Sequence, residues 1–141
     1  MPPPEEPLTL ELTLRHVRSA QLGLPVPASF RYDVRQPFTV GLVLNSATDG
    51  PVNWQLSREL LYSGTRVLSG IGDVRIWPTS MPGNADTVRL RLGPSHAFAL
   101  FEADRAGLRT WIRRTFDLVP AGTESRHIDW DSLAHRLLSG R

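Results

Sequence analysis

Three side chains that can bind metal ions stand at alternate positions near the C-terminal end. They are His127, Asp129 and Asp131, in the stretch HIDWD. On a strand they would share one face, and an imidazole with two carboxylates can hold a transition metal. The two carboxylates also suit the start of a helix, where unpaired amides and the helix dipole favour negative charge. We favour the helix start over the metal site.

Other catalytic chemistry finds little support in the residue types. The chain has no cysteine, which excludes thiolate nucleophiles, thiolate metal sites and disulfides, and it has no phosphate-loop lysine because all 16 basic residues are arginines. The GIG at residues 70–72 lacks the third glycine and the following helix of a dinucleotide-binding loop. No G-x-S-x-G elbow is present, and His16 and His96 in strands and His135 in a helix suit structural or solvated roles. The residues thus show no recognisable catalytic constellation, and we expect no cofactor.

Arginines beside a tryptophan raise the possibility of nucleic-acid binding. The residues are Arg75, Trp77, Arg89 and Arg91. If their strands are neighbours, one sheet face presents guanidinium groups for phosphates and an indole for stacking bases. Asp73 would lie on the same face and could pair with Arg75, which makes a solvated face the favoured alternative. The net charge of +2 does not by itself indicate a nucleic-acid partner.

A second set of arginines repeats every four residues. Arg105, Arg109 and Arg113 would form a stripe of like charge along one helix, which suits an acidic protein partner. The alternative is a solvated helix face on which nearby acids partly neutralise the stripe. These acids are Glu102, Asp104 and Asp117.

The elements that must position these residues are mostly strands. Alternation of apolar and polar residues predicts about seven or eight mainly antiparallel strands. The predicted strand regions are 8–15, 24–38, 38–46, 52–56, 72–78, 87–92 and 96–102. Pro25 and Pro27 restrict the second region to a sheet edge or an extended entry.

Helices follow the strands towards the end of the chain. Ser57 is a suitable cap for a short helix that Gly64 could close. Apolar residues at helical spacing, Trp111 among them as a core residue, predict the main helix over 103–116. A last short helix follows Asp129 and carries an apolar stripe. This order predicts an α+β fold with one domain over 8–141 after a disordered lead at 1–7.

Several blocks in one order resemble the SsgA-like sporulation and cell-division proteins. The blocks are LPVPASFRYD, QPF, W followed by RELL and G at 54–64, GDVRIWP, and VPAGTESRHID, and the similarity runs from about Leu8 to Leu138. The resemblance implies a Whirly-like fold, a homotrimer and a non-enzymatic role in septum formation. It also implies protein contacts with FtsZ and with an SsgA-like sibling. The N-terminal stretch has no signal-peptide pattern, and no apolar run is long enough to span a bilayer, so we expect the protein in the cytoplasm at the division septum.

Overall fold

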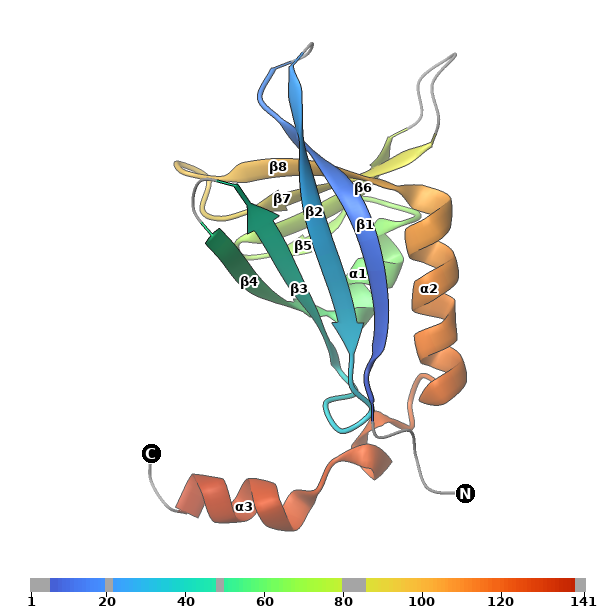
Figure 1. Ribbon diagram of the computed structural model, residues 1–141. Helices are drawn as coiled ribbons and strands as arrows, with labels where there is room; N and C mark the ends of the chain where they lie inside the picture. Colours follow the sequence, from blue (N-terminus) through green and yellow to red (C-terminus); the bar gives the residue numbers. More distant parts are fainter. Residues whose placement is uncertain (1–5, 20–21, 48–49, 80–85, 139–141) are drawn as a thin grey trace.

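One antiparallel sheet dominates the structure. The computed structural model describes residues 6–19, 22–47, 50–79 and 86–138, so residues 1–5 of the predicted lead lie outside the described residues. Eight strands are hydrogen-bonded in the order β4-β3-β2-β1-β8-β7-β6-β5 (Figure 1). The strands are β1 (Leu8–Val17), β2 (Gly23–Tyr32), β3 (Thr39–Ser46), β4 (Gly50–Ser57), β5 (Ser69–Ile71), β6 (Val74–Thr79), β7 (Thr87–Leu92) and β8 (Ala99–Asp104). The predicted strand-rich α+β fold is confirmed.

The helical segments lie between and after two groups of strands. They are α1 (Arg58–Gly64), α2 (Arg105–Leu118), the 3-10 turn η1 (Glu124–His127) and α3 (Trp130–Leu138). The groups β1–β4 and β5–β8 meet where β1 pairs with β8, at Arg15 opposite Glu102 and His16 opposite Phe101. In Figure 1 the strands of the second group run across the direction of the first, and α1 connects the two groups.

The core lies between the apolar face of the sheet and the helices α1 and α2. Strand alternation places Phe30 and Leu42 on this face, where each is at most 1% exposed. Trp111 of α2 is 2% exposed, and its ring centroid lies 6.1 Å from that of Phe30, so the prediction of a core tryptophan is confirmed. Gly64 allows α1 to approach β6 closely, because a Cβ at this position would overlap the side chain of Ile76.

Caps set the boundaries of two helices. The Ser57 Oγ accepts a hydrogen bond from the Leu60 amide at 3.1 Å, which confirms the predicted cap of α1. The Asp104 carboxylate accepts a hydrogen bond from the Gly107 amide at 2.8 Å. This cap starts α2 at Arg105, two residues later than the sequence pattern predicts.

One short strand was missed, and one local prediction needs correction. The short strand β5 has no alternation that could reveal it, since it consists of Ser-Gly-Ile. His96 is not in a strand, because the Ala97 amide bonds the Pro94 carbonyl in a turn and β8 begins only at Ala99. β2 lies inside the sheet, yet its residues Pro25 and Pro27 precede the Ala28–Arg31 stretch that pairs with β3, so the extended entry is as predicted.

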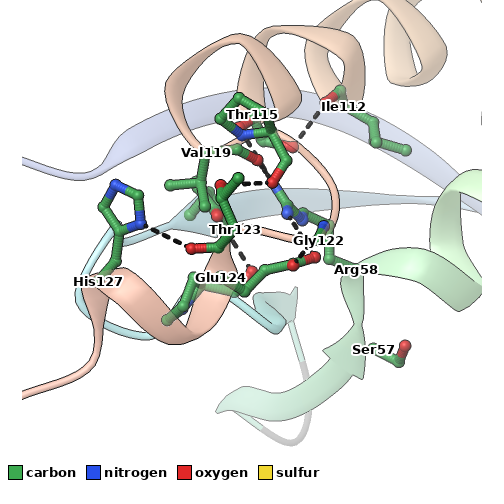
Figure 2. A network of polar contacts seen from close by, with 12 residues as sticks. Ser57, Arg58, Ile112, Thr115, Val119, Gly122, Thr123, Glu124 and His127 are labelled. Carbon is green, nitrogen blue, oxygen red and sulfur yellow. Dashed lines mark hydrogen bonds and ion pairs between the residues drawn. The ribbon is translucent and has the colours of Figure 1, made fainter.

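A buried arginine connects α1 to the end of α2. Arg58 is 1% exposed, and its Nη1 donates hydrogen bonds to the carbonyls of Thr115 at 3.0 Å and Val119 at 2.8 Å. Its Nη2 donates to Glu124 Oε2 at 3.0 Å (Figure 2). These carbonyls belong to the last turn of α2 and the residue after it, where backbone donors run out. The Thr115 carbonyl also accepts the Val119 amide at 3.0 Å. Arg58 therefore caps α2 from outside the helix.

Two aromatic rings lie next to the Arg58 guanidinium, and hydrogen bonds hold its neighbours Tyr32 and Glu124 in place. The Arg58 Cζ lies 4.0 Å from the ring centroid of Phe116 and 5.0 Å from that of Tyr32. Burial raises the pKa of Tyr32 to about 12, and its hydroxyl donates to the Pro37 carbonyl at 3.0 Å. Hydrogen bonds from its own amide and from Arg58 hold the pKa of Glu124 below its usual range.

Replacement of the buried cation should destabilise the whole domain. Arg58→Met leaves the Val119 carbonyl without its Arg58 donor, the Thr115 carbonyl with only the Val119 amide, and the Glu124 carboxylate without its cation. We therefore expect the free energy of unfolding in urea to fall by about 3 kcal/mol. Glu124→Gln keeps a neutral acceptor and should cost about 1 kcal/mol. Arg31→Met, on the exposed face of β2, is the matched control and should cost less than about 0.5 kcal/mol. Equal losses for Arg58→Met and Arg31→Met would contradict this assignment.

Candidate binding surfaces

The predicted arginine stripe lies on α2 and is extended by α1. Arg109 and Arg113 surround Tyr62 together with Arg66, whose Cζ lies 5.8 Å from the Tyr62 ring centroid. Arg105 also has a structural role, because its Nε donates a hydrogen bond to the Thr65 carbonyl at 2.6 Å and so links the start of α2 to the residue after α1. We call these four arginines and Tyr62 the helix arginine patch. Sequence reasoning missed Tyr62 and Arg66, although their spacing of four residues at the end of α1 was a signal.

The patch is cationic because four arginines gather around one tyrosine. A hydrogen bond from Arg113 lowers the pKa of Tyr62, and Arg66 and Arg109 act in the same direction. Glu102 pairs with arginines of the sheet, and Asp104 caps α2. Asp117 forms no ion pair within the described residues. None of these three acids forms an ion pair with an arginine of the patch within the described residues.

The second predicted set comes together on the outer face of the sheet. Trp77 stands opposite Arg89, and Arg75 stands opposite Arg91, in the β6–β7 ladder. The next strand places Glu102 opposite Arg89, and the Arg89 Nε donates to Glu102 Oε2 at 3.0 Å. Arg89 thus has a carboxylate partner, whereas Arg75 and Arg91 form no ion pair among the residues that the structure describes.

A shallow hollow lies over the Arg75–Arg91 pair. Its volume is about 480 Å³, and it is lined by Leu68, Arg75, Trp77, Pro78 and Arg91. We call it the sheet-face hollow. The predicted Asp73–Arg75 ion pair is absent from the described residues, because Asp73 belongs to the turn before β6 rather than to the strand face. Two arginines directly opposite each other repel, so an anion placed between them would be stabilised.

The candidate metal ligands do not form a common face. His127 ends the turn η1, while Asp131 lies in the first turn of α3, as the helix interpretation predicts. Across the described residues no group of three or more histidine, aspartate and glutamate side chains could hold a metal ion. The helix interpretation of HIDWD is confirmed.

A third surface, which sequence reasoning missed, is a groove at the lower end of α2. Its volume is about 850 Å³, and it runs between Phe38, α1, the end of α2 and the loop at 120–122. Phe38 is 51% exposed, and Phe116 forms part of the wall. Glu59, Arg113 and Asp117 are its charged lining residues besides Glu124. We call it the helix groove; its parts are too distant in sequence for any local pattern to show it.

These features define an α+β protein with two arginine-rich surfaces and one antiparallel sheet, in which the strands β5–β8 run across the direction of β1–β4. A family model described as "Streptomyces sporulation and cell division protein, SsgA" matches residues 26–124. The chain belongs to this SsgA-like family, as its sequence blocks predict.

Several relatives along nearly the whole chain carry the name SsgB. The sporulation-specific cell division protein SsgB of Salinispora tropica is 41% identical, with 94% of this chain and 93% of that protein covered. SsgB of Streptomyces coelicolor is 39% identical, with 92% and 95% covered. A crystal structure of an SsgA-like sporulation-specific cell division protein from Thermobifida fusca is 34% identical, has a TM-score of 0.83 and covers 96% of this chain and 98% of its own. Within the family, this chain is therefore similar to proteins named SsgB.

The described helices include none that is long and apolar enough to cross a membrane.

The two tyrosines allow a direct test of the helix arginine patch. Tyr62 should ionise below its ordinary pKa of 10.0 and Tyr32 near 12, which gives two steps in an absorbance titration. Arg113→Gln removes the hydrogen bond that stabilises the phenolate, so the lower step should move to higher pH while the upper step stays in place. Arg31→Gln is the control and should move neither step. A lower step that is unchanged in Arg113→Gln would contradict the Arg113–Tyr62 contact.

Proposed function

We propose that this chain is a non-enzymatic recruiter that brings FtsZ to sporulation septa in the cytoplasm and promotes its assembly, together with an SsgA-like sibling. Its relatives are sporulation-specific cell division proteins, which supports a role in septum formation. The observation that carries the contact itself is the helix arginine patch. Its arginines have no carboxylate partner among the described residues, so an acidic partner surface is their natural complement.

The mechanism rests on several weak contacts made at once. A homotrimer would present three copies of the helix arginine patch to a filament that repeats the same acidic surface. Once one copy is bound, the others bind at high effective concentration, so avidity far exceeds the affinity of one site. Such a protein would concentrate filaments at one place without chemical conversion of any substrate. The trimer is part of the proposal.

Sedimentation with FtsZ polymers tests the recruiter. We expect the wild-type protein to pellet with FtsZ in the presence of the SsgA-like sibling, and the double variant R66E/R109E to bind about tenfold or more weakly. R75E/R91E makes the same change of charge on the sheet face and should bind within about twofold of wild type. Arg113 is left in place because it also lines the helix groove. Wild-type protein that neither pellets with FtsZ nor changes its assembly would overturn the proposal.

A second candidate function is the binding of single-stranded nucleic acid at the sheet-face hollow. The observation in its favour is the juxtaposition of Arg75 and Arg91 with Trp77 around one hollow. Two guanidinium groups could each contact a phosphate while the indole stacks on a base. A likeness of fold to nucleic-acid-binding proteins is only an analogy for function, so this candidate rests on the geometry of these residues.

Titration of a labelled oligonucleotide of about twenty thymidines separates the two functions. With two phosphates neutralised, the logarithm of the binding constant should fall with the logarithm of salt concentration at a slope of about −1.4. Trp77→Ala should weaken binding about tenfold, whereas R66E/R109E should leave the hollow intact and change the affinity much less. Absence of binding at low salt would remove this candidate without affecting the recruiter.

A further inference from the structure

The two arginines of the sheet-face hollow lean towards different neighbouring strands. Arg75 stands opposite Gly70 of the edge strand β5, and its side-chain carbons lie over this glycine, in the space that a Cβ would need. Arg91 lies on the other side, with its Cζ 5.1 Å from the ring centroid of Phe98, the residue before β8. Because Arg75 and Arg91 are directly opposite each other in the β6–β7 ladder, a space opens between their side chains.

The positive charge of this space is not balanced by the fold. Neither arginine of the hollow forms an ion pair in the described part of the chain. Glu102, on the same face of β8, pairs with Arg15 and Arg89 instead. The Arg91 Nε is shielded from water and has no hydrogen-bond partner among the described residues. An anion between the two guanidinium groups would relieve their repulsion and supply the missing acceptors.

The rest of the hollow is apolar. Trp77 follows Arg75 by two residues on the same strand face, and Leu68, which precedes β5, is 67% exposed. An indole offers a flat surface on which another ring can stack. The volume of about 480 Å³ is within the range of about 300–1,000 Å³ that is typical of small-molecule sites. The hollow therefore suits a compact ligand that carries both a ring and an anionic group.

The number of cations favours a terminal phosphate as the anionic group. A terminal phosphate has a charge of about −1.5 to −2 at neutral pH and three free oxygens, whereas a phosphodiester has a single negative charge. Each guanidinium can bind phosphate oxygens through two parallel N–H groups. Arg75 and Arg91 approach the hollow from opposite sides, so both can bind one phosphate at the same time.

We propose that the sheet-face hollow binds a free nucleoside monophosphate. The terminal phosphate lies between Arg75 and Arg91, and the base stacks on Trp77 beside Leu68. The inference rests on the same hollow as the nucleic-acid candidate, but it assigns a different ligand, a small molecule with a terminal phosphate instead of a chain of phosphodiesters. It does not depend on contacts with FtsZ.

Calorimetric titration with adenosine monophosphate (AMP) at low salt tests the site. We expect one binding site per chain with a dissociation constant below about 1 mM. R75Q/R91Q should weaken binding about tenfold or more, because it removes both phosphate-binding groups. R66Q/R109Q is the matched control, since it removes the same charge from the helix arginine patch, and it should bind AMP within about twofold of wild type.

Two related ligands test the separate parts of the site. The methyl ester of AMP has one negative charge fewer at its phosphate and should bind several-fold more weakly than AMP. Ribose phosphate has no base and should bind about tenfold more weakly. Trp77→Ala should weaken the binding of AMP about tenfold and leave that of ribose phosphate within about twofold, a difference that a loss of folding would not produce.

Three results would overturn the proposal. They are the absence of saturable AMP binding at millimolar concentration, equal losses in R75Q/R91Q and R66Q/R109Q, and a methyl ester that binds as well as AMP. A wild-type protein that binds the thymidine oligonucleotide but not AMP would also overturn it, while the nucleic-acid candidate would stand. Binding of AMP by a protein that does not pellet with FtsZ would support this site and count against the recruiter alone.

Discussion

The buried guanidinium of Arg58 is the constraint on which much of this structure depends. A cation that is 1% exposed must find hydrogen-bond acceptors inside the protein, because its removal from water would otherwise be very costly. Arg58 finds two carbonyls at the end of α2 and one carboxylate in the turn η1. Those three acceptors must therefore converge on one point beneath β2, where Tyr32 lies against the same cation. A single side chain at the start of α1 thus determines where α2 ends and how the chain leaves it.

The same network shapes a surface as well as a core. Phe116 contacts Arg58 with its ring and also forms part of the helix groove, and Glu124 binds Arg58 and lines the groove. The Glu124 Oε1 accepts a hydrogen bond from the Gly122 amide at 2.7 Å, which closes the loop at 120–122 (Figure 2). The apolar groove is therefore the outer side of the arrangement that satisfies the buried charge. The direction in which α3 leaves is set by the turn that follows Glu124.

The sequence could predict much of the fold, but it could not predict the pairing of distant strands. Alternation identified strands such as β1 and β7 because a half-buried strand must alternate, and helical spacing identified α2 and the buried Trp111. β5 could not be predicted, because a strand of three residues is too short to show an alternation of apolar and polar side chains. The pairing of β1 with β8 joins strands that are far apart in the sequence, so it has no local signal. The burial of Arg58 has no local signal either, because a polar residue at the start of a helix is normally exposed. This burial depends on acceptors some 57 to 66 positions further along the chain.

The candidate sites were predictable to the extent that neighbouring strands or one helix supplied them. Arg75, Trp77, Arg89 and Arg91 lie together because β6 and β7 form a hairpin, and Arg109 and Arg113 lie together because helical spacing aligns them. The contacts of Glu102 and Asp104 had no local signal, because they depend on strand register and on helix capping. Tyr62 and Arg66 joined the α2 arginines only through the packing of α1 on α2.

Strand register also separates the charges that hold the fold from those that face a partner. Glu102 lies opposite Arg89 on β7 and opposite Arg15 on β1, so it forms ion pairs on both sides of β8, at the junction of the two strand groups. Arg91 follows Arg89 by two residues on the same face, but the residue opposite it on β8 is Leu100, which offers no charge. Arg91 instead lies against Phe98, with its Cζ 5.1 Å from the ring centroid. Two arginines that are two residues apart on the same strand face thus have different roles. Arg89 forms a structural ion pair, whereas Arg91 can bind an anion.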